Sequence, residues 1–303
     1  MAVERYAAID IGTNSVLLLI AEKNAANAFS PLLELAEISR LGRGVDAEKR
    51  LSEEGIKETL SVLRTFCSRA IGLDVSGLVM TATSAVRDAT NRDLFLKRVY
   101  EATGHSIEVL SGESEAALTY AAIAGGRSSN PAVVDIGGGS TEIIFGPAKD
   151  QSFRRSFNIG AVRLTERFVK NDPLSKDEVD SMVQYIRETL GSLPSPPTGS
   201  EVIAVAGTAT TLYALQNRID PYDAALVEGG TLSLEQISKL ARRLVGMKLA
   251  ERLRLPGLQP KRADVICAGA LILQTTLEQL GVTACKVSDR GLRWGVMADR
   301  FAH

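Results

Sequence analysis

Hydrophobic and polar positions follow two spacings along this chain, and each spacing predicts one type of element. Short apolar runs bounded by Gly, Asn, Asp or Pro predict strands, and apolar residues three or four positions apart predict amphipathic helices. Ile56, Leu60 and Leu63 have the helical spacing, and Ser52 before them is a suitable N-cap. The expected strands lie at residues 3–21 (a hairpin), 30–40, 77–83, 106–110, 132–145 (a second hairpin) and 202–206. The expected helices lie at residues 52–70, 92–103, 111–120, 175–190 and 265–279, with two more beginning near residues 233 and 292.

Both predicted hairpins turn through the same motif. Residues 10–15 read Asp-Ile-Gly-Thr-Asn-Ser and residues 135–140 read Asp-Ile-Gly-Gly-Gly-Ser. Glycine lets such a turn expose consecutive backbone N–H groups, which form a concave site for an anion such as phosphate. The alternative is that both turns are simple hairpin corners. Two copies in matching strand contexts instead predict two related half-domains.

Two phosphate turns that face each other would bring Asp10 and Asp135 close to one polyanion. Like charges oppose such binding unless a cation lies between them, and Mg²⁺ is commonly held by one or two carboxylates and by substrate oxygens. The duplicated turns therefore predict a site for Mg²⁺, or Mn²⁺, beside a phosphate chain.

Length and charge limit the classes of function. A chain of 303 residues suits two domains, and a net charge of −1 provides no general attraction for nucleic acid or an anionic membrane. The cysteines, Cys67, Cys267 and Cys285, are scattered and are expected to be reduced core residues. The N-terminal sequence does not resemble a signal peptide, and the longest uncharged apolar stretch, residues 265–273, is too short to cross a bilayer. We therefore expect a cytoplasmic protein.

The two turn motifs together resemble those of the exopolyphosphatase and guanosine pentaphosphate phosphohydrolase (Ppx/GppA) family, within the actin, Hsp70 and sugar-kinase superfamily. The resemblance extends over essentially the whole chain. It implies an α/β fold of two actin-like (ribonuclease H-like) domains, each a mixed sheet with helices, that face an interdomain cleft. The expected domains are residues 1–124 and 125–303, with a hinge at residues 125–131 and a last helix, about 292–303, that packs back on the first domain. A homodimer is the expected assembly.

The resemblance also names two catalytic candidates. Arg87 ends an Ala-Thr-x-x-x-Arg motif between a strand and a helix, where the family has a phosphate-clamping arginine. Glu115 precedes Ala116 at the position of the family's catalytic base, and Ser114 replaces the family's preceding glutamate. Both assignments have ordinary alternatives. An arginine can simply solvate a turn, and Glu113 and Glu115 are favourable in a first helical turn because of the helix dipole.

Further candidates bind phosphate or metal. Glu142 lies two positions after Ser140, so the two share a strand face, and we expect it near the phosphate; the alternative is an exposed strand glutamate. The turn at Gly207 and Thr208 joins a strand to a helix N-terminus, which can bind an anion. The expected phosphate-binding residues are Asp10, Gly12, Thr13, Asn14, Ser15, Gly137, Gly138, Gly139, Ser140, Gly207 and Thr208, and the expected metal ligands are Asp10, Asp135 and Glu142.

Three other segments match the family without an assigned role. Residues 41–47 contain a Leu-Gly-x-Gly motif that we expect to be a surface loop, and residues 160–164 contain Gly-x-Val-Arg-Leu. Asp289, Arg290 and Arg293 belong to the family's closing motif, in which Trp294 replaces a frequent glutamate. These three charged residues either form structural ion pairs or line the active site.

Several catalytic classes lack their residues here. The chain has two histidines, Cys285 and Arg290 are one residue too close for a cysteine phosphatase, and no Walker A motif is present. Metal-assisted attack by water on a terminal phosphorus remains. The resemblance implies an exopolyphosphatase, with a predicted preference for short polyphosphate. The alternatives are a guanosine pentaphosphate 5′-phosphohydrolase, a kinase of the same superfamily and a non-catalytic nucleotide-sensing protein.

Overall fold

A computed structural model describes residues 4–125, 131–146 and 153–302. The chain divides into two compact units. The first unit combines Met1–Ala122 with Leu292–His303, and the second comprises Ile123–Gly291. Residues 126–130, the centre of the predicted hinge, lie outside the described residues.

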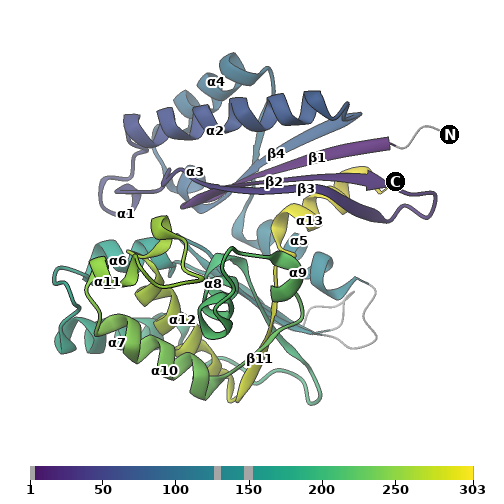
Figure 1. Cartoon of the computed structure of the whole chain (residues 1–303). Coiled ribbons are helices and arrows are strands. Elements are labelled where there is room, and N and C mark those ends of the chain that lie inside the picture. Colours follow the sequence, from purple (N-terminus) through teal and green to yellow (C-terminus); the bar gives the residue numbers. More distant parts are fainter. Residues whose placement is uncertain (1–3, 126–130, 147–152, 303) are drawn as a thin grey trace. The chain divides into compact units, whose positions relative to one another are not determined.

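The first unit contains a five-stranded sheet in the order β3-β2-β1-β4-β5 (Figure 1). β1 pairs antiparallel with β2, which pairs antiparallel with β3, whereas β1, β4 and β5 run parallel. This mixture follows from the connections, because a tight hairpin joins antiparallel strands and a helical crossover joins parallel ones. The strands are β1 (Glu4–Ile11), β2 (Ser15–Lys23), β3 (Phe29–Ile38), β4 (Gly77–Ala82) and β5 (Ile107–Val109).

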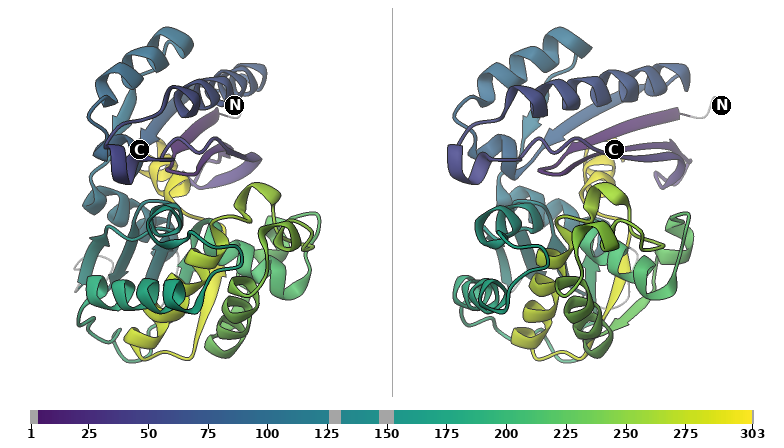
Figure 2. Two further views of the ribbon diagram at one scale, coloured as in Figure 1. Left: turned by 90° about the vertical axis from the view of Figure 1, so that its left-hand side faces the viewer. Right: turned by 60° about the vertical axis from the view of Figure 1, so that its left-hand side comes forward.

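Helices cover both faces of this sheet. α2 (Glu53–Gly72) begins at the predicted cap, where Ser52 Oγ accepts a hydrogen bond from the Gly55 N–H. α2 and α4 (Arg92–Thr103) pack on one face, as Figure 2 shows. On the other face, α13 (Leu292–Phe301) packs against β1, and the Phe301 ring stacks on Tyr6. The remaining helices of this unit are α1 (Val45–Glu48), α3 (Ser84–Asp88) and α5 (Gly112–Ala124), whose last residues belong to the second unit.

The second unit contains a six-stranded sheet in the order β10-β11-β9-β6-β7-β8. Its strands are β6 (Ala132–Ile136), β7 (Thr141–Phe145), β8 (Phe153–Phe157), β9 (Val202–Val205), β10 (Thr231–Ser233) and β11 (Ala284–Ser288). β6, β7 and β8 are antiparallel, and β6, β9 and β11 are parallel. Leaving β10 aside, order and direction repeat those of the first sheet. The prediction of two related halves is therefore confirmed.

One buried cluster joins this second sheet to its helices. α12 is apolar on nearly every side and packs against α7 and α10. Capping boxes open α7 and α10, at Ser175 with Glu178 and at Ser233 with Gln236. The helices are α6 (Ala161–Phe168), α7 (Lys176–Leu190), α8 (Ala206–Asn217), α9 (Ala224–Val227), α10 (Leu234–Val245), α11 (Leu249–Arg252) and α12 (Ile266–Leu280), with a 3₁₀ turn η1 (Pro260–Arg262).

The structure corrects one element. Residues 41–47 are not a surface loop throughout, because Leu41 and Gly42 are buried and α1 begins at Val45. Leu41 joins the core of the first unit, and Gly42 has no side chain to prevent close packing. Only Arg43 and Ala47 within this segment are exposed.

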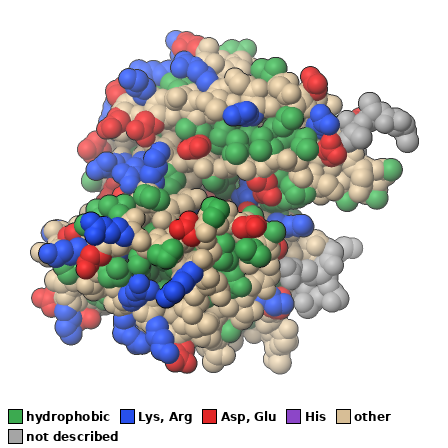
Figure 3. All heavy atoms as spheres, in the orientation of Figure 1, with side chains coloured by type: hydrophobic (Ala, Val, Ile, Leu, Met, Phe, Trp, Pro, Cys, Tyr) green, Lys and Arg blue, Asp and Glu red, His purple; other side chains and the backbone are tan. Residues whose placement is uncertain are grey.

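Surface charge agrees with the near-neutral composition. On the face drawn in Figure 3, basic and acidic side chains are interspersed over both units. Arg293 is buried and forms an ion pair of 2.6 Å with Glu34 within the first unit. Within residues 4–125, 131–146 and 153–302, no helix combines the length and apolarity that a membrane crossing requires.

Candidate functional site

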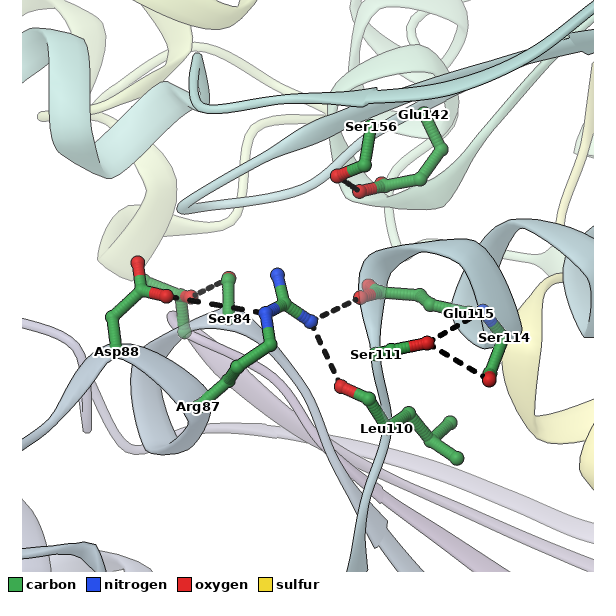
Figure 4. A network of polar contacts seen from close by, with 10 residues as sticks. Ser84, Arg87, Asp88, Leu110, Ser111, Ser114, Glu115, Glu142 and Ser156 are labelled. Atoms are coloured by element: carbon green, nitrogen blue, oxygen red, sulfur yellow. Dashed lines mark hydrogen bonds and ion pairs between the residues drawn. The ribbon is translucent and has the colours of Figure 1, made fainter.

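Arg87 and Glu115 are brought together within the first unit. β4 ends at Ala82, and α3 follows and presents Arg87 at its last turn. Arg87 Nη1 donates to Glu115 Oε2 at 3.2 Å and to the Leu110 carbonyl oxygen at 3.0 Å (Figure 4). The side chains are 22% and 11% exposed, so neither is a freely solvated surface group. The contact joins the carboxyl ends of two adjacent parallel strands, where open α/β sheets place ligand-binding side chains.

Ser114 lies at the start of α5. Ser111 Oγ accepts a hydrogen bond from the Ser114 N–H at 3.1 Å, and the two hydroxyl groups are 2.9 Å apart. Ser111 is thus the N-cap of α5, and the Ser114 hydroxyl group lies beside this cap at the position where the family has a glutamate. Glu115, the next residue, is buried, whereas Glu113 is exposed. This difference fits the sequence-based distinction between the two glutamates.

The first glycine turn lies between β1 and β2. Gly12 donates from its N–H to the Ser15 carbonyl at 2.9 Å, which closes the turn. The Thr13 and Ser84 hydroxyl groups are 2.8 Å apart and both side chains are buried. Since Ser84 opens the helix that carries Arg87, this hydrogen bond connects the first turn to the Arg87–Glu115 pair. Asp10, at the end of β1, is also buried.

The second turn has the same closure. Gly137 donates from its N–H to the Ser140 carbonyl at 3.0 Å. Asp135 on β6 pairs in register with Glu142 on β7, and they are 7% and 1% exposed. Glu142 is therefore not an exposed strand residue. Ser156, its neighbour on β8, donates from Oγ to Glu142 Oε1 at 2.6 Å (Figure 4).

The third predicted turn begins α8. Gly207 is the second residue of this helix, and a Cβ atom there would lie 1.5 Å from Nη1 of Arg262. The Thr208 side chain is buried and packs against Gly269 of α12. Any anion contact made by Thr208 would therefore use its backbone N–H at the helix N-terminus rather than its hydroxyl.

The structure thus forms two groups of candidates, one in each unit. Asp10, Thr13, Arg87 and Glu115 belong to the first unit, whereas the other two predicted metal ligands, Asp135 and Glu142, belong to the second. In the part of the chain that the structure describes, no three His, Cys, Asp or Glu side chains gather in an arrangement that could hold a metal ion. A shared metal site with Asp10 remains a prediction.

Sequence reasoning missed three contacts that support these candidates. Ser84 bonds to Thr13, Ser156 bonds to Glu142, and Arg163 Nε donates to the Gly139 carbonyl oxygen at 2.8 Å. Strand register would have identified Ser156, because it lies opposite Glu142. The other two depend on packing between elements that are distant in sequence, for which the chain carries no local signal.

Comparison with known proteins gives the family. The model of the Ppx/GppA phosphatase family matches residues 19–302. The chain belongs to the Ppx/GppA phosphatase family. It is 36% identical to "Exopolyphosphatase 2" of Mycobacterium tuberculosis, with 98% of each chain covered. It is 29% identical to "Guanosine-5'-triphosphate,3'-diphosphate pyrophosphatase" of Photobacterium profundum, of which it covers 59%.

Solved structures of this family have the same fold. The crystal structure of the Aquifex aeolicus family member superimposes with a TM-score of 0.81 at 36% identity, covering 98% of this chain and 97% of that one. The predicted fold of two actin-like domains, each a mixed sheet with helices, is therefore confirmed. Membership of this phosphatase family makes the chain a phosphoanhydride hydrolase.

Proposed function

We propose that this Ppx/GppA phosphatase is an exopolyphosphatase, which releases terminal orthophosphate from inorganic polyphosphate by hydrolysis. The Arg87–Glu115 pair carries the proposal. In this pair the Glu115 carboxylate can accept a proton from water, and the Arg87 guanidinium is suited to binding phosphate. The hydrogen bond between Thr13 and Ser84 connects the pair to the first glycine turn, which we propose binds phosphate. The full-length similarity to an exopolyphosphatase of Mycobacterium tuberculosis supports this substrate over the others.

In the proposed reaction, water attacks the terminal phosphorus in line with the bridging oxygen that leaves. Glu115 accepts a proton from the attacking water. Arg87 and the N–H groups of the glycine turns stabilise the charge on the phosphoryl oxygens, which is the main requirement of phosphoryl transfer. The bond from Arg87 to the Leu110 carbonyl fixes the guanidinium, so that it need not reorganise during the reaction.

Asp135 and Glu142 fit a divalent cation. Two carboxylates directly opposite each other on neighbouring strands are unfavourable when both are ionised, and a hard cation with oxygen ligands relieves this repulsion. We propose that they hold Mg²⁺ or Mn²⁺, with water and substrate oxygens completing the coordination. The bound ion would neutralise charge on the phosphate chain.

One comparative assay tests the proposal. Orthophosphate release is measured with tripolyphosphate, long-chain polyphosphate, guanosine pentaphosphate and ATP, with and without Mg²⁺. Metal-dependent release that is fastest from polyphosphate is expected. Faster release from guanosine pentaphosphate would favour the second activity, which relatives such as the Photobacterium profundum protein carry in their name. ATP consumption that requires an added acceptor would indicate a kinase, and binding without release a non-catalytic protein.

A single substitution tests the proposed base. Glu115→Gln removes the proton acceptor but preserves the shape of the side chain, and loss of a general base costs roughly 10²–10⁴-fold in rate. We expect this loss in kcat with little change in substrate affinity. Unchanged turnover would remove Glu115 from the role. The predicted preference for short chains is tested by measuring the lengths of the polyphosphate chains present during digestion of a long polyphosphate.

A further inference from the structure

The carbonyl groups of the three glycines in the second turn, Gly137, Gly138 and Gly139, accept hydrogen bonds from one neighbouring element. The N–H of Ala161 donates to the Gly137 carbonyl at 3.0 Å, and the N–H groups of Val162 and Arg163 donate to the Gly138 carbonyl at 2.9 and 3.1 Å. These three donors are the first residues of α6. The N-terminus of α6 therefore holds the carbonyl side of the turn.

Arg163 completes this arrangement with its side chain. Its Nε donates to the Gly139 carbonyl oxygen at 2.8 Å, and the side chain is buried to 8% exposure. A buried guanidinium is costly unless it is hydrogen-bonded, and the bond to the Gly139 carbonyl oxygen meets part of this requirement. The Arg163 side chain thereby holds the Gly139 carbonyl, the third carbonyl of the turn.

Holding the carbonyls also sets the direction of the N–H groups. In a trans peptide, the C=O of one residue and the N–H of the next point in opposite directions. The three carbonyls that α6 fixes belong to the same peptide groups as the N–H groups of Gly138, Gly139 and Ser140. These N–H groups are therefore directed away from α6, as an anion site requires.

The first turn is held in the same way at equivalent positions. The Thr13 carbonyl accepts from the Gly42 N–H at 2.8 Å, and the Asn14 carbonyl accepts from the N–H groups of Ser39 and Arg40 at 3.1 and 3.0 Å. These donors follow β3, just as α6 follows β8. In the repeated topology, Thr13 corresponds to Gly138 and Asn14 to Gly139. We call residues 39–42 the first carbonyl clamp, and residues 160–163 the second.

Each clamp needs a glycine for its close approach. A Cβ atom at Gly42 would lie 2.2 Å from Cγ2 of Thr13, and one at Gly160 would lie 2.4 Å from the Gly138 carbonyl oxygen. Neither distance is compatible with a side chain at unchanged geometry. The burial of Gly42, which the sequence did not predict, thus has a direct consequence for the first turn.

We propose that the two carbonyl clamps are positioning elements of the phosphatase, and that Gly42 and Arg163 orient the N–H groups of the glycine turns toward the phosphate chain. This inference rests on the proposed function, because it assigns those N–H groups to substrate. Neither residue contacts substrate in this proposal. Gly42 acts through Thr13, and Arg163 acts through Gly139.

The first clamp allows a rescue experiment. Gly42→Ala places a methyl group against Thr13 Cγ2, and Thr13→Ser removes that Cγ2 while keeping the hydroxyl group that bonds to Ser84. Gly42→Ala should weaken tripolyphosphate binding and lower kcat/KM by about 10- to 100-fold, because small misplacements of positioning groups have effects of this size. The double variant Gly42→Ala/Thr13→Ser should recover part of the loss, because contacts of 3.1 Å with Thr13 Cβ and Ala85 Cβ remain. Gly72→Ala is the matched control, since a Cβ there would meet no atom within 4 Å beyond its chain neighbours and the backbone of its own helix.

The second clamp is tested with Arg163→Met, and Arg154→Met is the control at an exposed arginine of the same unit. Binding of tripolyphosphate is measured by calorimetry in the presence of Mg²⁺, with Glu115→Gln added to every variant so that turnover is slow, and well below the unfolding temperature of each variant. Arg163→Met should weaken this binding about 10-fold or more, and Arg163→Lys should lose less because its ammonium group can still donate. A purely structural Arg163 would lower the unfolding temperature and leave the affinity of the folded protein unchanged.

The outcomes separate the two proposals. If folded Gly42→Ala and Arg163→Met bind and hydrolyse tripolyphosphate like the wild type, or if Thr13→Ser does not rescue Gly42→Ala, the clamp inference is wrong while the proposed function stands. If the wild type binds tripolyphosphate but releases no orthophosphate, the proposed function fails, and the binding data still decide the role of the clamps. Should Arg163→Met fail to fold, the Gly42 and Thr13 variants decide alone.

Discussion

Arg87 Nη1 lies 3.2 Å from Glu115 Oε2 and 3.0 Å from the Leu110 carbonyl oxygen, so one nitrogen of the guanidinium joins α3, α5 and the end of β5. Lysine carries its charge as a point and cannot reproduce this planar arrangement while also contacting phosphate. We expect Arg87→Lys to lower kcat by about 10- to 100-fold, since positioning accounts for effects of that size.

The matched control for this substitution is Arg92→Lys. Arg92 opens α4 in the same unit, and its side chain is 53% exposed in an ion pair with Asp93. Such surface pairs contribute little, so activity should not change. Steady-state orthophosphate release at saturating polyphosphate measures both variants. Equal activity of Arg87→Lys and the wild type would contradict the assigned role.

Ser156 is expected to control metal affinity. Its Oγ donates to Glu142 Oε1 at 2.6 Å and fixes a carboxylate that we propose as a metal ligand. Loss of a group that orients a metal ligand typically costs 10- to 100-fold in affinity or activity. Ser156→Ala should therefore raise the Mg²⁺ concentration for half-maximal activity by about 10-fold. Ser156→Thr, which keeps the hydroxyl group, should stay near the wild type, and an unchanged Mg²⁺ requirement in Ser156→Ala would count against Glu142 as a ligand.

The three cysteines should be unreactive in the native protein. All are buried, and burial raises the pKa of the Cys267 thiol to about 11 and that of Cys285 to about 12. Because the thiolate is the reactive form, very little of it is present near neutral pH. Ellman's reagent at pH 8 should label the native chain slowly and the guanidinium-unfolded chain rapidly. Fast labelling of a folded sample would show that a cysteine is accessible.

Glu178 should make stability depend on pH in the acidic range. Hydrogen bonds from the N–H groups of Ser175 and Lys170, with further bonds from the Ser175 and Asn171 side chains, lower the pKa of Glu178 from 4.5 to about 2. Since the folded pKa is below the unfolded one, the ionised group stabilises the fold above pH 4.5, and this stabilisation is lost as pH falls toward 2.

The matching experiment is Glu178→Gln with urea unfolding at several pH values. Glutamine keeps an acceptor but not the charge, so we expect a loss of about 1 kcal/mol in unfolding free energy at pH 7. The difference from the wild type should shrink as the pH is lowered from 5 to 3, roughly the window between the two pKa values. A difference that is constant with pH would mean that the charge of Glu178 does not contribute.

Much of the fold could be read from the sequence because its signals are local. The duplicated motif at residues 10–15 and 135–140 predicted two hairpins, and the repeated sheet topology confirms the two related halves. The helix predicted at residues 175–190 is α7 (Lys176–Leu190), which a capping box of Ser175 and Glu178 opens. These features depend on hydrogen bonds between residues close in sequence, so residue type and spacing suffice to find them.

The supporting contacts of the site could not be read in this way. The bonds from Ser84 to Thr13 and from Arg163 to Gly139 join residues that are far apart in the chain. The wrong prediction of a surface loop at residues 41–47 has the same cause. The Leu-Gly-x-Gly motif is typical of a loop, and only the tertiary structure shows that Gly42 packs against Thr13.

The sequence by itself determined where the two glycine turns lie and predicted them as phosphate sites, since glycine spacing between apolar strands is typical of a hairpin corner with exposed N–H groups. Only the tertiary structure decided what holds those turns, because α6 and residues 39–42 reach the turn carbonyls through packing of whole elements. The same packing decided that Arg87 meets Glu115 and that Ser156 meets Glu142. Such pairings arise from how sheets and helices are layered, and no local pattern of residues encodes that layering.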